Sequence, residues 1–138
     1  MSQRVDVVVM AAGKDTRMKS ALPKVLHRLG GRALAVHVLD CAARLSARQA
    51  VVITGHGAEQ VEPALAQAVP ALPLRFARQE PQLGTGHAVL QALPLLADDG
   101  VTLVLSGDVP LTQPETLQAL LDTCDGQHLA LLTLDMPD

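Results

Sequence analysis

Cationic side chains gather in one short segment near the start of the chain. Residues 14–32 hold six lysines and arginines and a single acid, Asp15, although the whole chain has a net charge of −3. Ala11, Ala12 and Gly13 come directly before the cations, and such small residues let a backbone approach a ligand and expose its N–H groups. The segment therefore predicts a polyphosphate site, with a solvated basic loop as the alternative. The six cations are Lys14, Arg17, Lys19, Lys24, Arg28 and Arg32.

A carboxylate stands at the end of an apolar run much later in the chain. Asp108 follows Gly107, directly after the run Val101–Ser106. Mg²⁺ takes oxygen ligands and shares them with substrate phosphates, so a carboxylate in this position suits that ion. An aspartate that only caps a turn is the alternative. Together with a basic phosphate loop, the metal site is the better interpretation.

A third polar segment, "RQEPQLGTGHAV", covers residues 78–89. The small residues 84–86 predict a helix start, where N–H groups point outward, or else a plain tight turn. Gln79 and Gln82 carry amides that both donate and accept hydrogen bonds, which is the chemistry needed to read the edge of a base. His87 alone is more often a packing or surface histidine than a catalytic one.

Several other chemistries are excluded by spacing. The chain has neither the G-x-x-x-x-G-K-[ST] pattern of a P-loop nor the G-x-G-x-x-G pattern of a dinucleotide site. Its histidines show no metal-ligand spacing, and no Ser/His/Asp or Cys/His arrangement can be identified. Cys41 and Cys124 lie far apart, so two free thiols in a reducing compartment are expected rather than a disulfide.

The composition indicates one domain without nucleic-acid or membrane partners. The chain has 138 residues, of which 49% are hydrophobic and 1% aromatic, with Phe76 the single ring. Such a core suits helices packed on a sheet, and it suits stacking on nucleic-acid bases poorly. The net charge of −3 also argues against a general polyanion binder. Because neither a signal peptide nor an apolar run of about 18 residues is present, we expect a soluble, cytoplasmic protein.

Strand-like and helix-like segments alternate along the chain. Apolar runs predict strands at residues 5–10, 49–54, 74–78, 101–106 and 129–134. Amphipathic patterns predict helices at residues 33–45, 58–69 and 85–97, and a fourth that begins after a capping box formed by Thr112 and Glu115. In the third helix Val89, Leu93 and Leu96 are expected to face inward, with a bend at Pro94.

This alternation predicts right-handed βαβ units and a Rossmann-like, three-layer α/β/α fold with a mostly parallel sheet. Such sheets bind ligands outside the carboxyl ends of their strands, at the point where the strand order reverses. In the order 3-2-1-4 the first and fourth strands are neighbours. The basic loop and the loop with Asp108 would then face each other.

The three polar segments together resemble a known family. "MAAGKDTRMKSALPKVLHRLGG" resembles the signature loop of sugar-nucleotide pyrophosphorylases. With "QLGTGHAV" and "LSGDVPL", it is similar to the bacterial bifunctional N-acetylglucosamine-1-phosphate uridylyltransferases/glucosamine-1-phosphate acetyltransferases. The resemblance implies the nucleotide-diphospho-sugar transferase fold. It covers the front part of the family's uridylyltransferase domain, so residues 1–138 are expected to form its N-terminal nucleotide-binding part.

The resemblance also implies roles for individual residues. Arg17 and Lys24 are the catalytic cations that neutralise the triphosphate, and Lys24 also binds the nucleotide. Gln79 reads the uracil edge, and Asp108 is the Mg²⁺ ligand. The implied nucleotide-binding set is completed by Met10, Ala11, Ala12, Gly13, Gly84, Thr85, Ser106 and Gly107.

The reaction implied is transfer of UMP from UTP to N-acetylglucosamine-1-phosphate, which gives UDP-N-acetylglucosamine, a cell-wall precursor, and pyrophosphate. The attacking phosphate oxygen is already an anion, so positioning and charge neutralisation suffice and no general base is needed. Two alternatives stay open: a related nucleotidyltransferase with another nucleotide or sugar, and an inactive nucleotide-binding module. Asp15 stands where the family has a second glycine.

Overall fold

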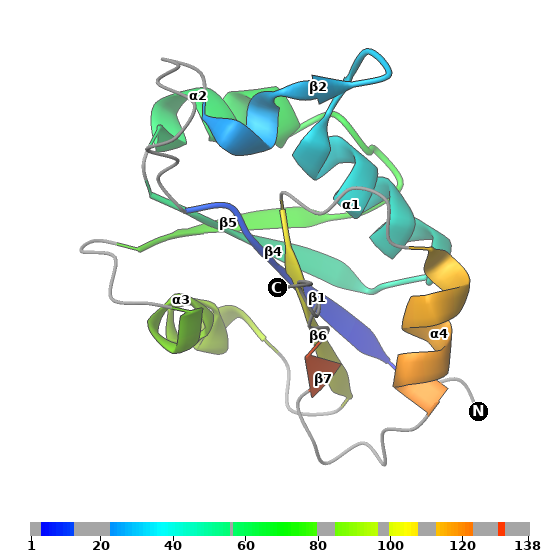
Figure 1. Cartoon of the computed structure of the whole chain (residues 1–138). Coiled ribbons are helices and arrows are strands. Elements are labelled where there is room, and N and C mark those ends of the chain that lie inside the picture. The colour runs from blue at the N-terminus through cyan, green and yellow to red at the C-terminus, as the bar shows by residue number, and fades with distance from the viewer. Residues whose placement is uncertain are drawn as a thin grey trace, which may run out of the picture.

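The computed structural model describes residues 4–12, 23–55, 57–79, 85–96, 100–107, 113–122 and 130–131. Its main feature is a five-stranded sheet in the order β5-β4-β1-β6-β7, with every pair parallel (Figure 1). Numbered along the chain, this is the order 3-2-1-4 expected for the first four strands, with the fifth added beside the fourth. The strands are β1 (Val5–Met10), β4 (Gln49–Thr54), β5 (Leu74–Arg78), β6 (Val101–Ser106) and β7 (Ala130–Leu131).

The central strands are buried on both faces, as their continuous apolar runs predict. Val8 of β1 lies opposite Val51 of β4 on one side and Val104 of β6 on the other, and all three side chains have 0% exposure. β-branched residues pack well on such a pleated surface. The four longer strands agree with the sequence prediction, and β7 is described only at Ala130–Leu131.

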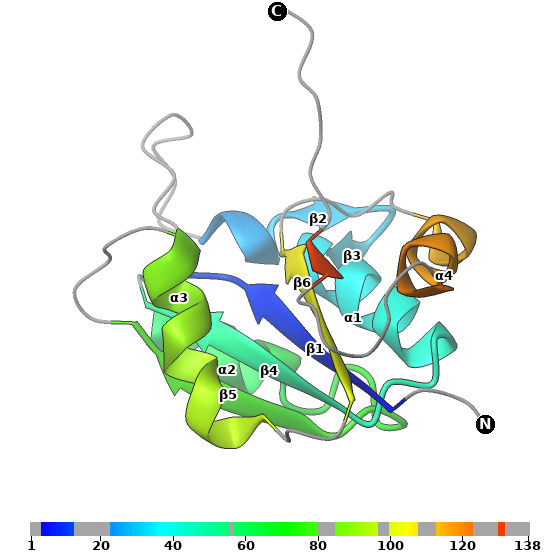
Figure 2. The ribbon, with the colours of Figure 1, turned by 90° about the horizontal axis from the view of Figure 1, so that it is seen from below.

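Helices cover both faces of the sheet and make the predicted three layers. One face carries α1 (Leu34–Arg44), α2 (Ala58–Leu65) and α4 (Pro114–Asp122). The other face carries α3 (Thr85–Ala92) and the 3₁₀ turn η2 (Leu93–Leu95), and Figure 2 shows α3 lying across this side of the sheet. No helix among the described residues is long and apolar enough to cross a membrane.

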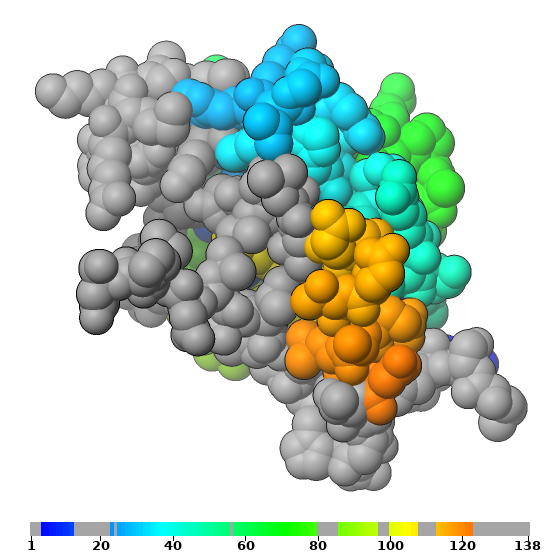
Figure 3. Space-filling model, turned by 45° about the vertical axis from the view of Figure 1, so that its right-hand side comes forward, coloured from blue at the N-terminus to red at the C-terminus, as the bar shows by residue number. Residues whose placement is uncertain are grey.

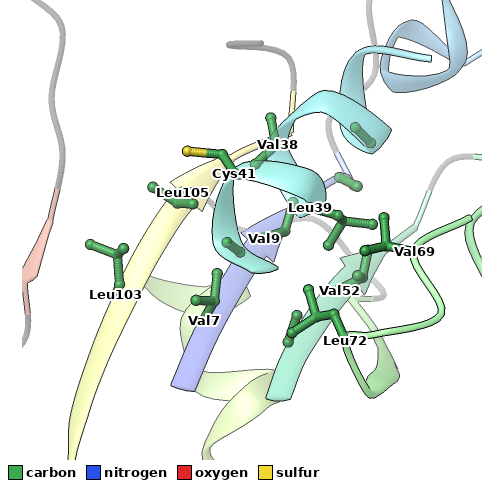
Figure 4. Close-up of a cluster of buried hydrophobic side chains, with 14 of the residues drawn as sticks. Val7, Val9, Val38, Leu39, Cys41, Val52, Val69, Leu72, Leu103 and Leu105 are labelled. Atoms are coloured by element: carbon green, nitrogen blue, oxygen red, sulfur yellow. The ribbon is translucent and has the colours of Figure 1, made fainter. Parts of the chain in front are cut away.

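The pleat of the strands divides the core into two clusters. On the three-helix face, Val7 and Val9 of β1 lie under Val38 and Leu39 of α1 (Figure 4). The thiol of Cys41 is buried in the same cluster and forms no disulfide among the described residues, and burial raises its pKa, while Cys124 lies outside the described residues. On the other face, Val8, Val51, Ile53 and Val104 pack against Ala88 and Ala92 of α3. Side chains of successive residues in one strand thus pack against helices on opposite faces of the sheet.

The third helix differs from its prediction. It ends at Ala92 and continues as the 3₁₀ turn η2, because Pro94 cannot donate the hydrogen bond that a further α-helical turn needs. Leu93, expected to face inward, is 52% exposed. Val89 and Leu96 pack against the core as predicted, and the fully buried contacts come from Ala88 and Ala92.

A short hairpin was not predicted. β2 (Arg28–Leu29) and β3 (Arg32–Ala33) pair antiparallel around Gly30 and Gly31, whose φ angles of +63° and +83° suit glycine. Arg28 and Arg32, which the sequence grouped with the phosphate-loop cations, therefore lie on this hairpin. The guanidinium of Arg32 lies 3.6 Å from the carboxylate of Asp40 on α1, so that arginine has a partner within the fold.

The last crossover has the opposite hand from the others. α1 connects β1 to β4, and α4 connects β6 to β7 in the opposite direction across the sheet. Both helices cover the same face, where they lie side by side (Figure 3), so their crossovers must differ in hand. The expectation of right-handed units throughout is wrong for this one. Burial of Leu117 and Leu121 in the cluster beneath α1 keeps α4 on that face.

Candidate functional site

The carboxyl ends of β1 and β6 meet at the point where the strand order reverses. Met10 pairs with Ser106, and the N–H of Gly107 donates to the carbonyl oxygen of Met10 at 2.9 Å. On the other side, the N–H of Ala11 donates to the carbonyl of Ile53 at 2.8 Å. The first residues of the two loops that the sequence expected to face each other are therefore joined directly.

Side chains leave little free space at this junction. Ala11 and Ala12 are 3% and 4% exposed, and their methyl groups enter the two core clusters on opposite faces. A Cβ on Gly107 would lie 3.0 Å from the carbonyl oxygen of Met10 and 3.2 Å from Cγ1 of Val25. A side chain there would require these neighbours to shift by a few tenths of an ångström, so glycine favours this close approach and the junction offers a ligand mainly backbone.

The returning end of the basic segment is held by the start of α2. Gly57 has a φ of +73°, and a Cβ there would lie 2.5 Å from Cγ of Pro23. Pro23 comes immediately before the 3₁₀ turn η1 (Lys24–Leu26), and its carbonyl accepts from the N–H of Leu26 at 2.9 Å. The contact of Gly57 with Pro23 thus positions the backbone of Lys24 relative to the loop after β4.

Gln79 comes directly after β5 at the same edge of the sheet. Its N–H donates to the carbonyl of Thr54 at 2.8 Å, and the residue is only 3% exposed. Its side-chain Nε2 lies 2.9 Å from Nδ1 of His87 on α3. His87, which the sequence left as a packing or surface histidine, is therefore the partner of a predicted site residue.

A charged network lies beside Gln79 and had no sequence signal. The carboxylate of Glu62 on α2 accepts from the hydroxyl of Thr54 at 2.8 Å and from the guanidinium of Arg78 at 3.1 and 3.3 Å. The hydrogen bond from Arg78 is the main cause that lowers the pKa of Glu62 below 4.5. Thr54 is fully buried at the end of β4, so its hydroxyl needs such a partner.

The remaining predicted residues are described in part or not at all. Gly13, Arg17, Gly84 and Asp108 lie outside the described residues. Lys24 and Thr85 have a described backbone, in η1 and at the first position of α3. Among the described residues no group of three histidine, cysteine or carboxylate side chains could hold a metal ion.

The arrangement favours binding and positioning over acid–base catalysis. The ring of His87 faces the amides of Gln79 and Gln91, so its described partners lack the hydroxyl or thiol and the orienting carboxylate of a catalytic triad. The described polar side chains at this edge include amides, the imidazole of His87, the hydroxyls of Thr54 and Ser106, and the ion pair of Glu62 with Arg78. Such groups recognise a ligand by hydrogen bonding.

Comparisons with known proteins identify the family to which the chain belongs. The model of the MobA-like NTP transferase domain matches residues 7–136. "Bifunctional protein GlmU" from Polaromonas sp. strain JS666 is 75% identical over 145 residues, which covers 100% of this chain and 30% of that protein. The chain thus spans about 30% of the length of this curated relative.

Two solved structures share the architecture. The inositol-1-phosphate CTP transferase from T. maritima aligns with a TM-score of 0.77 at 16% identity, covering 90% of this chain and 51% of that one. Rv0371c from Mycobacterium tuberculosis H37Rv, in complex with manganese, aligns with a TM-score of 0.67 at 21% identity, covering 88% and 60%. At sequence identities of 16% and 21%, the similarity to these two structures shows a shared fold and nothing more. Since the family model matches nearly the whole chain, this protein belongs to the family of MobA-like NTP transferase domains.

Proposed function

We propose that the chain binds UTP at the carboxyl ends of β1, β5 and β6 and transfers UMP to N-acetylglucosamine-1-phosphate, releasing pyrophosphate. The observation that carries this proposal is the hydrogen bond from Gly107 to Met10 at 2.9 Å. That bond joins two of the three segments whose sequences resemble the uridylyltransferase motifs. The third segment begins at Gln79, on the same edge of the sheet.

In this proposal each described element has a task. The backbone from Met10 to Ala12 lies against the nucleotide, which suits a junction where alanine side chains are turned into the core. Gln79 reads the base from a buried position at the end of β5. Lys24, held through Pro23 and Gly57, places positive charge beside the phosphates together with Arg17.

The proposed cofactor is a divalent cation that Asp108, the residue after Gly107 in the sequence, shares with the substrate. Among the described residues no group of three histidine, cysteine or carboxylate side chains could hold a metal ion by itself. Mg²⁺ is commonly held by one or two carboxylates and completed by phosphate oxygens and waters. When bound through Asp108, Mg²⁺ would neutralise charge on the phosphates. Rv0371c, which shares the fold, has been solved in complex with manganese, and this supports a divalent ion as the cofactor.

Binding and turnover test the proposal separately. Calorimetry with UTP, CTP and GTP in a Mg²⁺ series should give the tightest binding for UTP with Mg²⁺ present. Pyrophosphate release from UTP should require N-acetylglucosamine-1-phosphate, with glucose-1-phosphate as the control sugar. Tighter binding of another nucleotide would favour a related nucleotidyltransferase instead, and binding without any turnover would favour an inactive nucleotide-binding module.

The metal ligand has its own test. Asp108→Asn should weaken Mg²⁺-dependent UTP binding and leave the thermal unfolding transition unchanged, because an amide is a poorer Mg²⁺ ligand than a carboxylate. Asp122→Asn on α4, an exposed aspartate bonded to Gln118, is the matched control. An Asp108→Asn chain with the wild-type Mg²⁺ dependence would contradict the assignment.

A further inference from the structure

A contact from the opposite layer of the fold reaches the side-chain amide of Gln79. Gln79 ends the segment after β5, and His87 lies on the first turn of α3. The amide Nε2 and the ring Nδ1 are 2.9 Å apart, which is the usual length of a hydrogen bond. Because Gln79 is 3% exposed, water cannot easily replace this partner.

The contact fixes the proton on the imidazole. An amide NH₂ group only donates, so Nδ1 must accept and the neutral ring must carry its proton on Nε2. The amide of Gln91 lies 3.2 Å from the carbonyl oxygen of His87 and 3.3 Å from its Nε2. In this tautomer Gln91 donates to the carbonyl, and the longer contact to Nε2 is not a hydrogen bond.

The structure sets the direction of the amide, and this tautomer stabilises it. With Nε2 of Gln79 bound to the ring, the planar amide places Oε1 on the side turned away from His87. A flip of the amide would set its oxygen against the lone pair of Nδ1 and lose the bond. The end of the amide that is turned away from α3 is therefore an acceptor.

Uracil and cytosine differ in what they present to an acceptor. The N3 atom of uracil carries a hydrogen and donates, whereas N3 of cytosine has a lone pair and only accepts. An amide oxygen matches the first and repels the second. In a buried site the unmatched pair is costly because no water compensates it.

We propose that His87 is a positioning residue that locks the amide of Gln79 with its oxygen turned away from α3, and so sets a preference for uracil over cytosine. The role of Gln79 in reading the base rests on the proposed function above. The lock itself is a contact between described residues, so it can be tested without any nucleotide.

The first experiment tests the hydrogen bond between Gln79 and His87 directly. In a ¹⁵N-labelled chain, long-range proton–nitrogen spectra distinguish the two tautomers of a histidine ring, and the side-chain NH₂ of Gln79 gives its own signals. We expect the Nε2–H tautomer for His87 and slow hydrogen exchange of the Gln79 amide. An Nδ1–H tautomer would overturn the proposal, because the amide would then have to face the ring with its oxygen.

The second experiment reads base preference by calorimetry with UTP and CTP at fixed Mg²⁺. In His87→Leu we expect the preference for UTP over CTP to fall about tenfold, which corresponds to about 1.4 kcal/mol. His87→Asn, whose Oδ1 can accept from the Gln79 amide, should keep the wild-type ratio. Leu90→Ala, at a 57% exposed position of the same helix, is the control for perturbing α3.

The outcomes separate the two proposals. If His87→Leu keeps the wild-type ratio while Gln79→Leu loses it, His87 does not set the preference and the inference is wrong. Equal loss in the Leu and Asn variants also contradicts it, because the retained acceptor then has no effect. If the wild-type chain binds neither nucleotide, the proposed function fails together with the base preference, and the tautomer and amide signals decide only whether His87 locks the amide of Gln79.

Discussion

The two ends of the sheet both contain bonded polar side chains, but they are built differently. At the amino end, Asp6 of β1 is 1% exposed, and its carboxylate accepts two hydrogen bonds from the guanidinium of Arg48 at 2.9 and 3.2 Å. At the carboxyl end, the carboxylate of Glu62 accepts two hydrogen bonds from the guanidinium of Arg78 at 3.1 and 3.3 Å, but these two side chains are 24% and 50% exposed. The carboxylate is thus buried at one end and partly exposed at the other, and its arginine partner is 31% exposed at the amino end and 50% exposed at the carboxyl end.

The difference separates a structural pair from a site. A buried carboxylate strongly destabilises the fold when its partner is removed, so the amino end should be sensitive to mutation in stability. An exposed pair contributes little, so the carboxyl end can carry charge and amides beside a ligand without controlling folding. We therefore expect mutations at the amino end to change stability, and mutations at the carboxyl end to change nucleotide binding.

The largest effect is expected at the amino end. Arg48→Met removes both hydrogen bonds from Arg48 to Asp6 and should lower the free energy of unfolding by about 3 kcal/mol, because the carboxylate of Asp6 stays buried. Urea unfolding measures the change. Arg44→Met is the matched control, because Arg44 lies 3.9 Å from Asp40 on the surface and should contribute almost nothing. Similar losses in both variants would contradict the contrast between buried and exposed pairs.

A second effect links stability to the site through Gly57. Gly57→Ala should lower the free energy of unfolding by about 2 kcal/mol, because alanine disfavours the left-handed φ of +73° and its Cβ meets Pro23. Gly30→Ala isolates the backbone contribution, since a Cβ there has nothing within 4 Å at a φ of +63°. In the double variant with Pro23→Ala, only the part of the stability loss that comes from the steric contact with Pro23 should be recovered. A Gly57→Ala cost no larger than that of Gly30→Ala would rule out the contact.

The phosphate loop offers a change that should act on binding alone. Asp15 lies outside the described residues, and its carboxylate stands in the segment with the six cations. Like charges repel by about 1 kcal/mol at around 4 Å in water, so Asp15→Gly should tighten UTP binding by up to about tenfold. Calorimetry across a Mg²⁺ series measures this. Weaker binding of the glycine variant at high Mg²⁺ would indicate instead that Asp15 recruits a cation.

The smallest effect is expected for the exposed pair at the carboxyl end. Glu62→Gln should lower the free energy of unfolding by less than about 1 kcal/mol at neutral pH. The lowered pKa of Glu62 gives stability that is present above the ordinary value of 4.5 and is lost as the pH falls through the folded-state pKa. The wild type and the variant should therefore converge in acid. A difference that grows as the pH falls would contradict this sign.

Much of the fold could be predicted because local patterns specify it. The four longer strands are continuous apolar runs, and the spacing of apolar residues predicted the four described α-helices. The errors had two sources, a local break in a helix and tertiary packing. Leu93 had the right spacing for an inward position, but Pro94 ended the α-helix and Ala88 and Ala92 made the contact. The hand of the last crossover depends on where α4 buries its leucines, which periodicity does not contain.

The site was predictable to a smaller extent. The glutamine, glycine and alanine residues stood out because their types are unusual at strand ends. The contact between Gln79 and His87 joins residues of different layers, so it depends on how α3 lies on the sheet. The ion pair between Glu62 and Arg78 also joins two separate elements, α2 and β5, so it too depends on tertiary packing. Only the Gly30–Gly31 pair was a visible signal that the sequence analysis passed over.

One measurement tests the central claim that the carboxyl end of the sheet is the nucleotide site. UTP with Mg²⁺ is titrated into the ¹⁵N-labelled chain, and shifts of backbone amide signals are followed residue by residue. We predict the largest shifts at Ala11, Ala12, Gln79 and Gly107, with Asp6 and Arg48 unchanged. Shifts centred on Asp6 and Arg48, or an unchanged carboxyl end while UTP binds, would contradict the account.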